Sequence, residues 1–321
     1  MRDKPEPSVS GNSQSFRAAT SELRAAPRSI AVDVLCELAK NVGMGIPPVR
    51  AWRLKRPRAG AFFSGCEDEL ERYAFFPLRH LLRFRGTVRG LDILEIGPGD
   101  FMTSGLALLA AGAKSYTVVD RFIGNYQAPQ AKTWYRGIRA AWPRLFPALP
   151  WPEDLQAEDF PEAYQNRVKI LVGTTEQVRA EKRYDVVCSF QVGEHVSDID
   201  AFARTNAQLL KPGATALHRV DFGPHDCWYQ YPDPLTFLRF PGWLWKLMGS
   251  NRGIPNRHRH HEFCAAFARA GMQYTVENVD HFPDRVIDQS RLSKRFRHMP
   301  PESLATRTAI YACRVGDSPH P

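Results

Sequence analysis

The chain has 321 residues, of which 43% are hydrophobic and 24% charged, and its formal net charge is +9. This composition predicts a globular protein with a sizeable core, and its basic surface suits nucleic acid, anionic lipid or an anionic small molecule equally. The six cysteines form no C-x-x-C pair, which excludes a disulfide framework or a cysteine zinc site. With no apolar leader and no run of roughly 20 apolar residues, we expect a cytoplasmic protein without a membrane span.

The N-terminal quarter of the sequence predicts a tail followed by helices. Residues 1–27 are rich in proline, serine and charge, which predicts a disordered tail. Apolar residues then recur at helical spacing over 29–41. A second helix is expected over 66–84, where an acidic start and a basic end match the helix dipole and Pro77 should break or kink it. We therefore expect an N-terminal helical cap over residues 28–88.

Strand and helix signals alternate through the rest of the chain. The alternation predicts a parallel sheet with helices on both faces, and two late strands add an antiparallel edge, which makes seven strands. Helices are expected near 103–111, 175–181 and 198–210. The expected strands are 91–96, 115–120, 168–172, 184–190, 214–221, 272–280 and 306–315.

Two aromatic segments interrupt this alternation, at residues 123–166 and 222–260. Long loops in compact domains are usually lids or disordered, and these segments are too aromatic for disorder. We expect the second, here called the lid, to be an insertion near the site. Its aromatic side chains could stack on a planar or sugar-like substrate, or they could pack the lid onto the core.

The stretch LDILEIGPGD, residues 91–100, is an apolar strand that stops at a glycine turn. A second apolar run ends about twenty residues later at Asp120, where a carboxylate can accept hydrogen bonds from two ribose hydroxyls. Met102 stands where a nicotinamide fingerprint needs a small residue, and no Gly-Lys-Ser/Thr follows as in a phosphate-binding loop. An acid at the first strand end, Glu95, followed by Gly-x-Gly is instead the pattern of S-adenosylmethionine (SAM) enzymes.

With these motifs, residues 90–221 resemble the class I (Rossmann-like) SAM-dependent methyltransferases. LDILEIGPGD resembles the first motif, SYTVVD the second, and YDVVCSFQVGEHV the fourth-strand motif. GPGD, ALHRVDFGPHD and NRHRHHEF further resemble a bacterial subgroup, although Phe101 departs from the third glycine of many members. The resemblance implies a methyltransferase domain over 89–321, the cofactor SAM, and SAM contacts from Glu95, Gly97, Pro98, Gly99, Asp100, Asp120, Arg121, Thr174, Thr175 and Gln191.

Catalytic groups are expected just after strands four and five, because ligands bind at the carboxyl ends of parallel strands. We predict His195, Asp221 and His225 as catalytic residues. A helix-start or packing role for His195 and a loop cap for Asp221 are the structural alternatives. No metal site is expected, because no second acidic cluster neighbours Glu194 and His195 in the sequence. His218 lies inside a strand pattern, which predicts a buried structural role.

The motif series favours methylation of an oxygen on a small-molecule or glycan-type substrate. An RNA or other nucleic-acid methyltransferase is the alternative that the charge suggests, although no RNA-binding module or nucleophile motif accompanies it. A non-catalytic SAM-fold binding protein is a third hypothesis, and a nicotinamide oxidoreductase a remote fourth. The cluster Arg257 to His261 predicts a solvated basic face, since adjacent histidines on a helix point in different directions. Nothing in the sequence indicates the oligomeric state.

Overall fold

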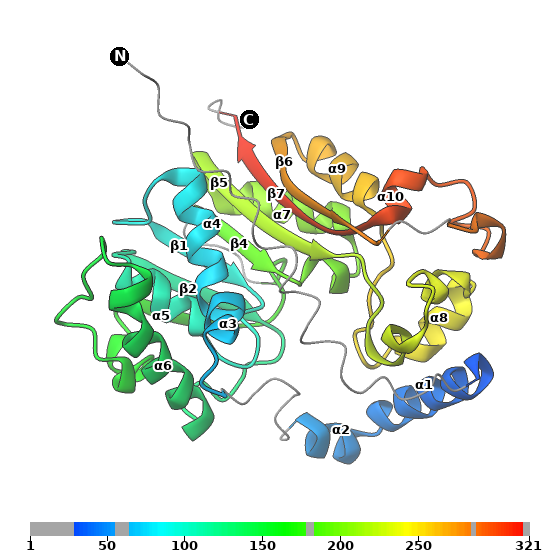
Figure 1. The fold of residues 1–321 in the computed structure, drawn as a ribbon, viewed down its shortest axis with the longest axis horizontal. Coiled ribbons are helices and arrows are strands. Elements are labelled where there is room, and N and C mark those ends of the chain that lie inside the picture. The colour runs from blue at the N-terminus through cyan, green and yellow to red at the C-terminus, as the bar shows by residue number, and fades with distance from the viewer. Residues whose placement is uncertain (1–28, 55–63, 178–182, 284–286, 317–321) are drawn as a thin grey trace.

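A computed structural model describes residues 29–54, 64–177, 183–283 and 287–316, arranged around one central sheet (Figure 1). The tail predicted for residues 1–27 lies outside the described residues. The seven strands run in the order β3-β2-β1-β4-β5-β7-β6. Their bounds are Asp92–Ile96 (β1), Ser115–Asp120 (β2), Val168–Val172 (β3), Tyr184–Phe190 (β4), Leu210–Asp221 (β5), Met272–His281 (β6) and Thr306–Val315 (β7).

The strand pairing confirms the predicted mostly parallel sheet. Strand β1 is the middle one of the five parallel strands and pairs with β2 and β4, while β2 pairs with β3 and β4 with β5. Strand β7 runs antiparallel between β5 and β6, so the antiparallel pairing is confined to one edge. Because the parallel strands end on the same side, the segments that follow β1, β2, β3, β4 and β5 meet at one edge of the sheet.

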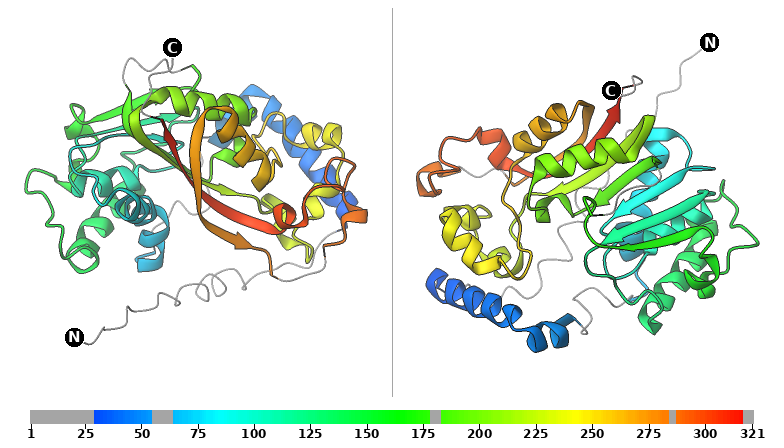
Figure 2. Two further views of the ribbon diagram at one scale, coloured as in Figure 1. Left: turned by 90° about the horizontal axis from the view of Figure 1, so that it is seen from above. Right: turned by 180° about the vertical axis from the view of Figure 1, so that it is seen from behind.

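Helices cover both faces of the sheet, as predicted (Figure 2). On one face α5 (Thr103–Ala110) and α6 (Pro129–Leu145) share an apolar cluster with α4 (Phe76–Arg85). On the other face α7 (Ile199–Leu209) and α9 (His260–Arg269) share a second cluster with the opposite side chains of the strands. The helix expected at 175–181 lies partly outside the described residues, and 175–177 form a turn.

The helix predicted over 66–84 is present but irregular. It consists of α3 (Glu67–Leu70), a wide π-helical turn (Glu71–Phe75) and α4, with Pro77 in the first turn of α4. Proline lacks the backbone N–H that donates the hydrogen bond in a regular helix. The hydrogen-bond pattern therefore changes in the wide turn directly before Pro77. Pro77 therefore lies where the π-helical turn changes to a regular α-helix within one continuous helical segment.

The expectation of a long loop over residues 123–166 is wrong, because 17 of its 44 residues form α6. Three aromatic side chains of the helix, Trp134, Tyr135 and Trp142, are at most 2% exposed in the first apolar cluster. The helical pattern was hidden because Pro143 lies within the last turn of the helix and most of its buried stripe is aromatic. These aromatic residues therefore build the core between α6 and the sheet.

The helix α1 (Ile30–Gly45), followed by α2 (Pro47–Leu54), packs against the lid helix α8 (Gly242–Gly249) and away from α3 and α4 (Figures 1 and 2). Its apolar stripe joins a third cluster formed by lid aromatics. A polar stripe is buried beside it: Tyr231 and Gln230 donate to Asp33, and Arg252 pairs with Glu37. Among the described helices, none combines the length and the apolar character needed to cross a bilayer.

Candidate active site

The glycine turn after β1 has the backbone shape that the sequence predicted. Gly97 and Gly99 adopt φ values of 68° and 79°, in the left-handed region that favours glycine. A Cβ atom on Gly97 would lie 2.6 Å from Cγ2 of Val192, in the loop after β4. The turn therefore passes very close to the neighbouring loop, and only glycine fits there.

Glu95 lies beneath this turn and supports it. Its side chain is 3% exposed and accepts hydrogen bonds from Ser104 in the first turn of α5 and from Tyr116 on β2. Burial raises the pKa of Glu95, although both hydrogen bonds act in the opposite direction. The carboxyl group thus joins β1, β2 and α5 directly under the position where a ligand would approach.

Gly105 is a residue that the sequence analysis missed. An added Cβ atom there would lie 2.2 Å from Cε1 of Tyr116, so the glycine makes room for the ring that reaches Glu95. In many methyltransferases a third glycine near the position of Phe101 or Met102 lets the helix approach the strand closely. Here Gly105 provides this close approach between α5 and β2. A glycine inside an otherwise apolar helix pattern was the available signal.

The segment after β2 packs onto the glycine turn. Oδ1 of Asp120 accepts a hydrogen bond from the backbone N–H of Phe122 at 2.8 Å, which curls the chain back. Gly124 then comes so near that a Cβ atom would lie 2.3 Å from the carbonyl oxygen of Asp100. Asp100 and Asp120 are thereby held on two adjoining loops at the carboxyl edge of the sheet.

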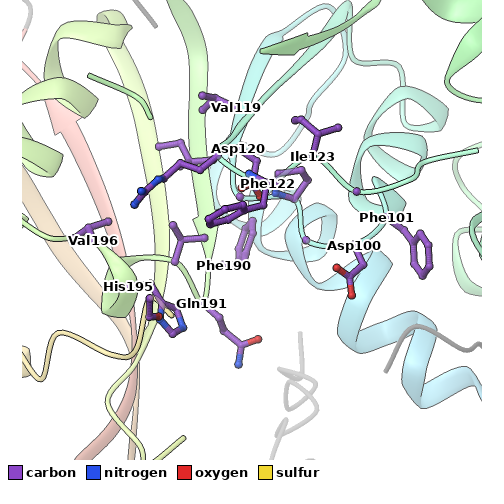
Figure 3. A pocket seen from close by; sticks show the side chains of 18 of the residues that line it. Asp100, Phe101, Val119, Asp120, Phe122, Ile123, Phe190, Gln191, His195 and Val196 are labelled. Atoms are coloured by element: carbon purple, nitrogen blue, oxygen red, sulfur yellow. Dashed lines mark hydrogen bonds between the residues drawn. The ribbon is translucent and has the colours of Figure 1, made fainter. Parts of the chain in front are cut away.

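A cavity of about 1760 Å³ opens over this edge (Figure 3). Figure 3 shows Gln191 and His195 beside each other on one side, with Asp100 and Phe101 on the opposite side. The volume exceeds the ~300–1,000 Å³ of a typical single-ligand pocket, so a cofactor and an acceptor could bind together. All ten residues predicted to contact the cofactor line the cavity, with His195 and His225; Asp221 lies behind them.

The loop after β4 is strained and clamped. Gln191 has a φ of 59°, which is uncommon for a residue with a side chain and often marks a functional position. Asn256 of the lid, another residue missed in the sequence, donates to the carbonyl oxygens of Gly193 and Val196, both at 2.9 Å. This clamp fixes the short 3-10 turn that carries Glu194 and His195.

The turns after β4 and β5 bring Glu194, His195 and His225 together. Their ligand-type atoms all lie within 4.8 Å of one another, and the two imidazole rings are 5.2 Å apart. Asp221 stands next to His225, with 3.8 Å between Oδ2 and Nε2. Its other oxygen, Oδ1, accepts from the backbone of Gly223 at 2.7 Å, so the predicted loop cap is present.

Burial controls the protonation of these groups. It lowers the pKa of His195 to about 4, and the neighbouring His225 acts in the same direction. It also lowers the pKa of His225 against the opposing influence of Asp221. Burial and the nearby Asp221 carboxylate raise the pKa of Glu194 well above its ordinary range. The lowered pKa values favour the neutral form of both imidazoles near pH 7.

Comparison with known proteins agrees with this architecture. Residues 66–277, about two thirds of the chain, match the family model described as a methyltransferase domain. The chain belongs to this methyltransferase family. No curated protein sequence matches the methyltransferase.

Solved structures of low sequence identity resemble the methyltransferase. An S-adenosylmethionine-dependent methyltransferase from Mesorhizobium loti is 15% identical with a TM-score of 0.38, covering 75% of this chain and 97% of the other. An O-methyltransferase family protein from Burkholderia thailandensis is 12% identical with a TM-score of 0.43, covering 78% and 59%. The magnesium protoporphyrin IX methyltransferase from Synechocystis with bound SAH is 16% identical with a TM-score of 0.40, covering 74% and 80%.

The expected solvated basic face at Arg257 to His261 is wrong. Arg259 is fully buried and donates to the carbonyl oxygens of Phe222, Leu304 and Thr306. Arg257 is 4% exposed and donates to the lid carbonyls of Phe237 and Phe240. The arginine pair therefore ties the lid and α10 (Pro301–Ala305) to α9, a role that a sequence run of basic residues does not reveal.

His218 of the methyltransferase has the buried structural role that was predicted, and it makes stability depend on pH. It is fully buried, its Nδ1 is 2.8 Å from the Ser189 hydroxyl, and burial lowers its pKa to about 3. Below pH 6.5 the unfolded chain binds a proton at His218 that the native state does not. The free energy of unfolding should therefore fall by about 1.4 kcal/mol per pH unit from this group as the pH drops toward 3.

Urea unfolding of wild type and His218→Phe at pH 6, 5 and 4 measures this contribution. The variant should lose stability less steeply with falling pH, by about the slope of one histidine. His298→Phe, at an exposed histidine, is the matched control and should keep the wild-type slope. Parallel slopes for wild type and His218→Phe would contradict the prediction.

Proposed function

We propose that this methyltransferase binds SAM in the cavity and transfers its methyl group to an oxygen atom of a small-molecule or glycan-type acceptor. The glycine turn after β1 supports the SAM site most directly, because Gly97 and Gly99 hold the left-handed backbone of a tight turn and carry no Cβ atom that would keep a ligand away from the backbone. The Asp120 carboxylate at the end of β2 is the candidate ribose ligand. Gly173, Thr174 and Thr175, which follow β3 and line the cavity, are the candidate adenine contacts.

The chemistry requires alignment and a proton acceptor. A lone pair of the acceptor oxygen forms the new O–C bond as the S–C bond of SAM breaks, and its electron pair stays on sulfur. An alcohol is a weak nucleophile at neutral pH, so its proton must pass to a nearby base. The neutral imidazoles of His195 and His225 are candidate proton acceptors, with Asp221 beside His225 to balance the charge that forms.

The position of the site favours a small acceptor over a nucleic acid. Besides the sheet edge, the cavity is lined by Arg50 and Arg53 of α2 and by lid residues 251–255. Groups placed between the sheet, α2 and the lid suit a ligand that these elements can enclose. The two arginines would favour an acceptor that carries an acidic group.

Titration calorimetry with SAM and with its demethylated product SAH tests the donor assignment on the full-length protein. Binding of one equivalent is expected, and absence of binding would refute the assignment. SAM labelled in the methyl group, incubated with cell extract from the source organism, then identifies the acceptor by the mass of the labelled product. Labelled RNA or DNA in place of a small molecule would refute the proposed substrate class. SAM binding without any methyl transfer would point to a non-catalytic protein.

A further inference from the structure

The Glu194 carboxyl group is buried without the partners that such a group requires. It is 3% exposed, and no hydrogen bond of good geometry reaches either carboxylate oxygen. Within the described part of the chain, no lysine or arginine forms an ion pair with it. A carboxylate buried alone costs several kcal/mol, so such groups are paired, protonated or bound to a metal.

Two imidazoles face this carboxyl group from different elements. His195 is the next residue in the turn after β4, and His225 follows β5, with its Nε2 buried and without a hydrogen bond. One ligand atom from each of the three groups lies within 4.8 Å of the other two. Tetrahedral ligands at about 2.1 Å from a common ion lie about 3.4 Å apart, so side-chain adjustments of about 1 Å close the set.

Neighbouring groups orient the histidines as outer-shell partners of a metal site do. Nδ1 of His195 is 2.8 Å from the carbonyl oxygen of Gly253, so this nitrogen carries the proton and Nε2 keeps its lone pair. The His225 ring stacks on Tyr229 with an interplanar angle of 6°. Asp221, 3.8 Å from Nε2 of His225, adds negative charge beside the set.

We propose that Glu194, His195 and His225 form a binding site for one divalent transition-metal cation, of the chemistry of Zn²⁺. Two imidazoles and one carboxylate favour such an ion over Mg²⁺ or Ca²⁺, which prefer oxygen ligands. Three protein ligands leave one position open. The cation would hold and acidify the acceptor hydroxyl in that position; with both imidazoles then bound to the cation, the hydroxyl proton would pass to the neighbouring Asp221 carboxylate instead. This role rests on the proposed function, whereas the binding itself does not.

The experiment measures metal binding directly, on full-length protein freed of metal by a chelator. Zn²⁺ is titrated by calorimetry, and Co²⁺ is followed by its visible d–d absorption, where thiolate charge-transfer bands would reveal cysteine binding instead. Wild type should bind one equivalent without thiolate bands. Glu194→Gln and His225→Gln each remove one ligand at nearly constant volume and should weaken binding at least about 100-fold.

His261→Gln is the matched control, because His261 is bonded to Ser303 outside the set and should leave the affinity unchanged. Circular dichroism and SAH titration of every variant show whether it is folded and binds the cofactor product. Unchanged Zn²⁺ affinity in folded Glu194→Gln, or no binding by folded wild type, overturns the metal site. SAH binding without metal binding refutes this inference alone, and metal binding without SAH binding refutes the SAM assignment alone.

Discussion

Asp120→Asn should abolish most of the affinity of the protein for SAM and SAH while leaving the fold intact. A carboxylate at this position can accept two hydrogen bonds from ribose hydroxyls, and hydrogen bonds to a charged group contribute about 1.5–3 kcal/mol each. Losing the charge and one acceptor should weaken binding about 100-fold. The asparagine can still accept from the Phe122 N–H through Oδ1, so the turn after β2 should persist.

Calorimetric titration of SAH into wild type and Asp120→Asn measures the effect. The matched control is Glu302→Gln, which neutralises an exposed carboxylate in α10 that does not line the cavity. The control should bind SAH like wild type. Equal affinities for wild type and Asp120→Asn would mean that the ribose is held elsewhere, and the assignment of this cavity to SAM would fail.

Gly105→Ala should cause a large loss of stability. The new Cβ atom would lie 2.2 Å from the ring of Tyr116, which is fully buried and fixed by its bond to Glu95. Relieving the clash requires α5 to move off the sheet or the ring to leave its site. Overpacking of this kind costs ~3 kcal/mol, which outweighs the gain in helix propensity from glycine to alanine.

Thermal and urea unfolding of Gly105→Ala measure this loss, and SAH titration should show weaker binding because Glu95 supports the glycine turn. Gly43→Ala is the control, since Gly43 also lies in a helix but its nearest neighbour would be a comfortable 3.9 Å away. The control should gain up to about 1 kcal/mol. A Gly105→Ala variant as stable as wild type would show that the contact between α5 and β2 is not tight.

The strands were predictable because each is a short apolar run between clear turn signals. All seven observed strands overlap the expected ranges, and β1, β2 and the turn between β1 and α5 match closely. Helix α6 was not predictable in the same way, because its buried stripe uses tryptophan and tyrosine next to prolines. The partners of the buried arginines Arg257 and Arg259 are backbone carbonyls far away in sequence, which no local pattern encodes.

The sequence predicted which loops form the site, but not which side chains of those loops meet. Motif spacing placed Asp120, Gln191 and His195 at one sheet edge, since the carboxyl ends of parallel strands meet there. It could not show that His225 turns back toward Glu194, because that contact depends on the path of the chain after β5. The sequence predicted no metal site, because only the neighbours of Glu194 and His195 along the chain were considered. The third member of the set, His225, lies in the loop after a different strand, β5.

The pairing of α1 with the lid determines how a substrate could enter. The cluster that joins them contains lid residues, α1 residues and the loops around α10, and no strand residue belongs to it. The helix α1, the lid and the loops around α10 therefore form a unit with its own apolar cluster. The cavity lies between this unit and the carboxyl edge of the sheet. Moving this unit away from the sheet would keep the packing inside the unit, including the contacts of the buried Asp33 and Glu37 with the lid. If the cavity opens by a hinge-like displacement of this whole unit, far less apolar surface is exposed than if the lid unfolds.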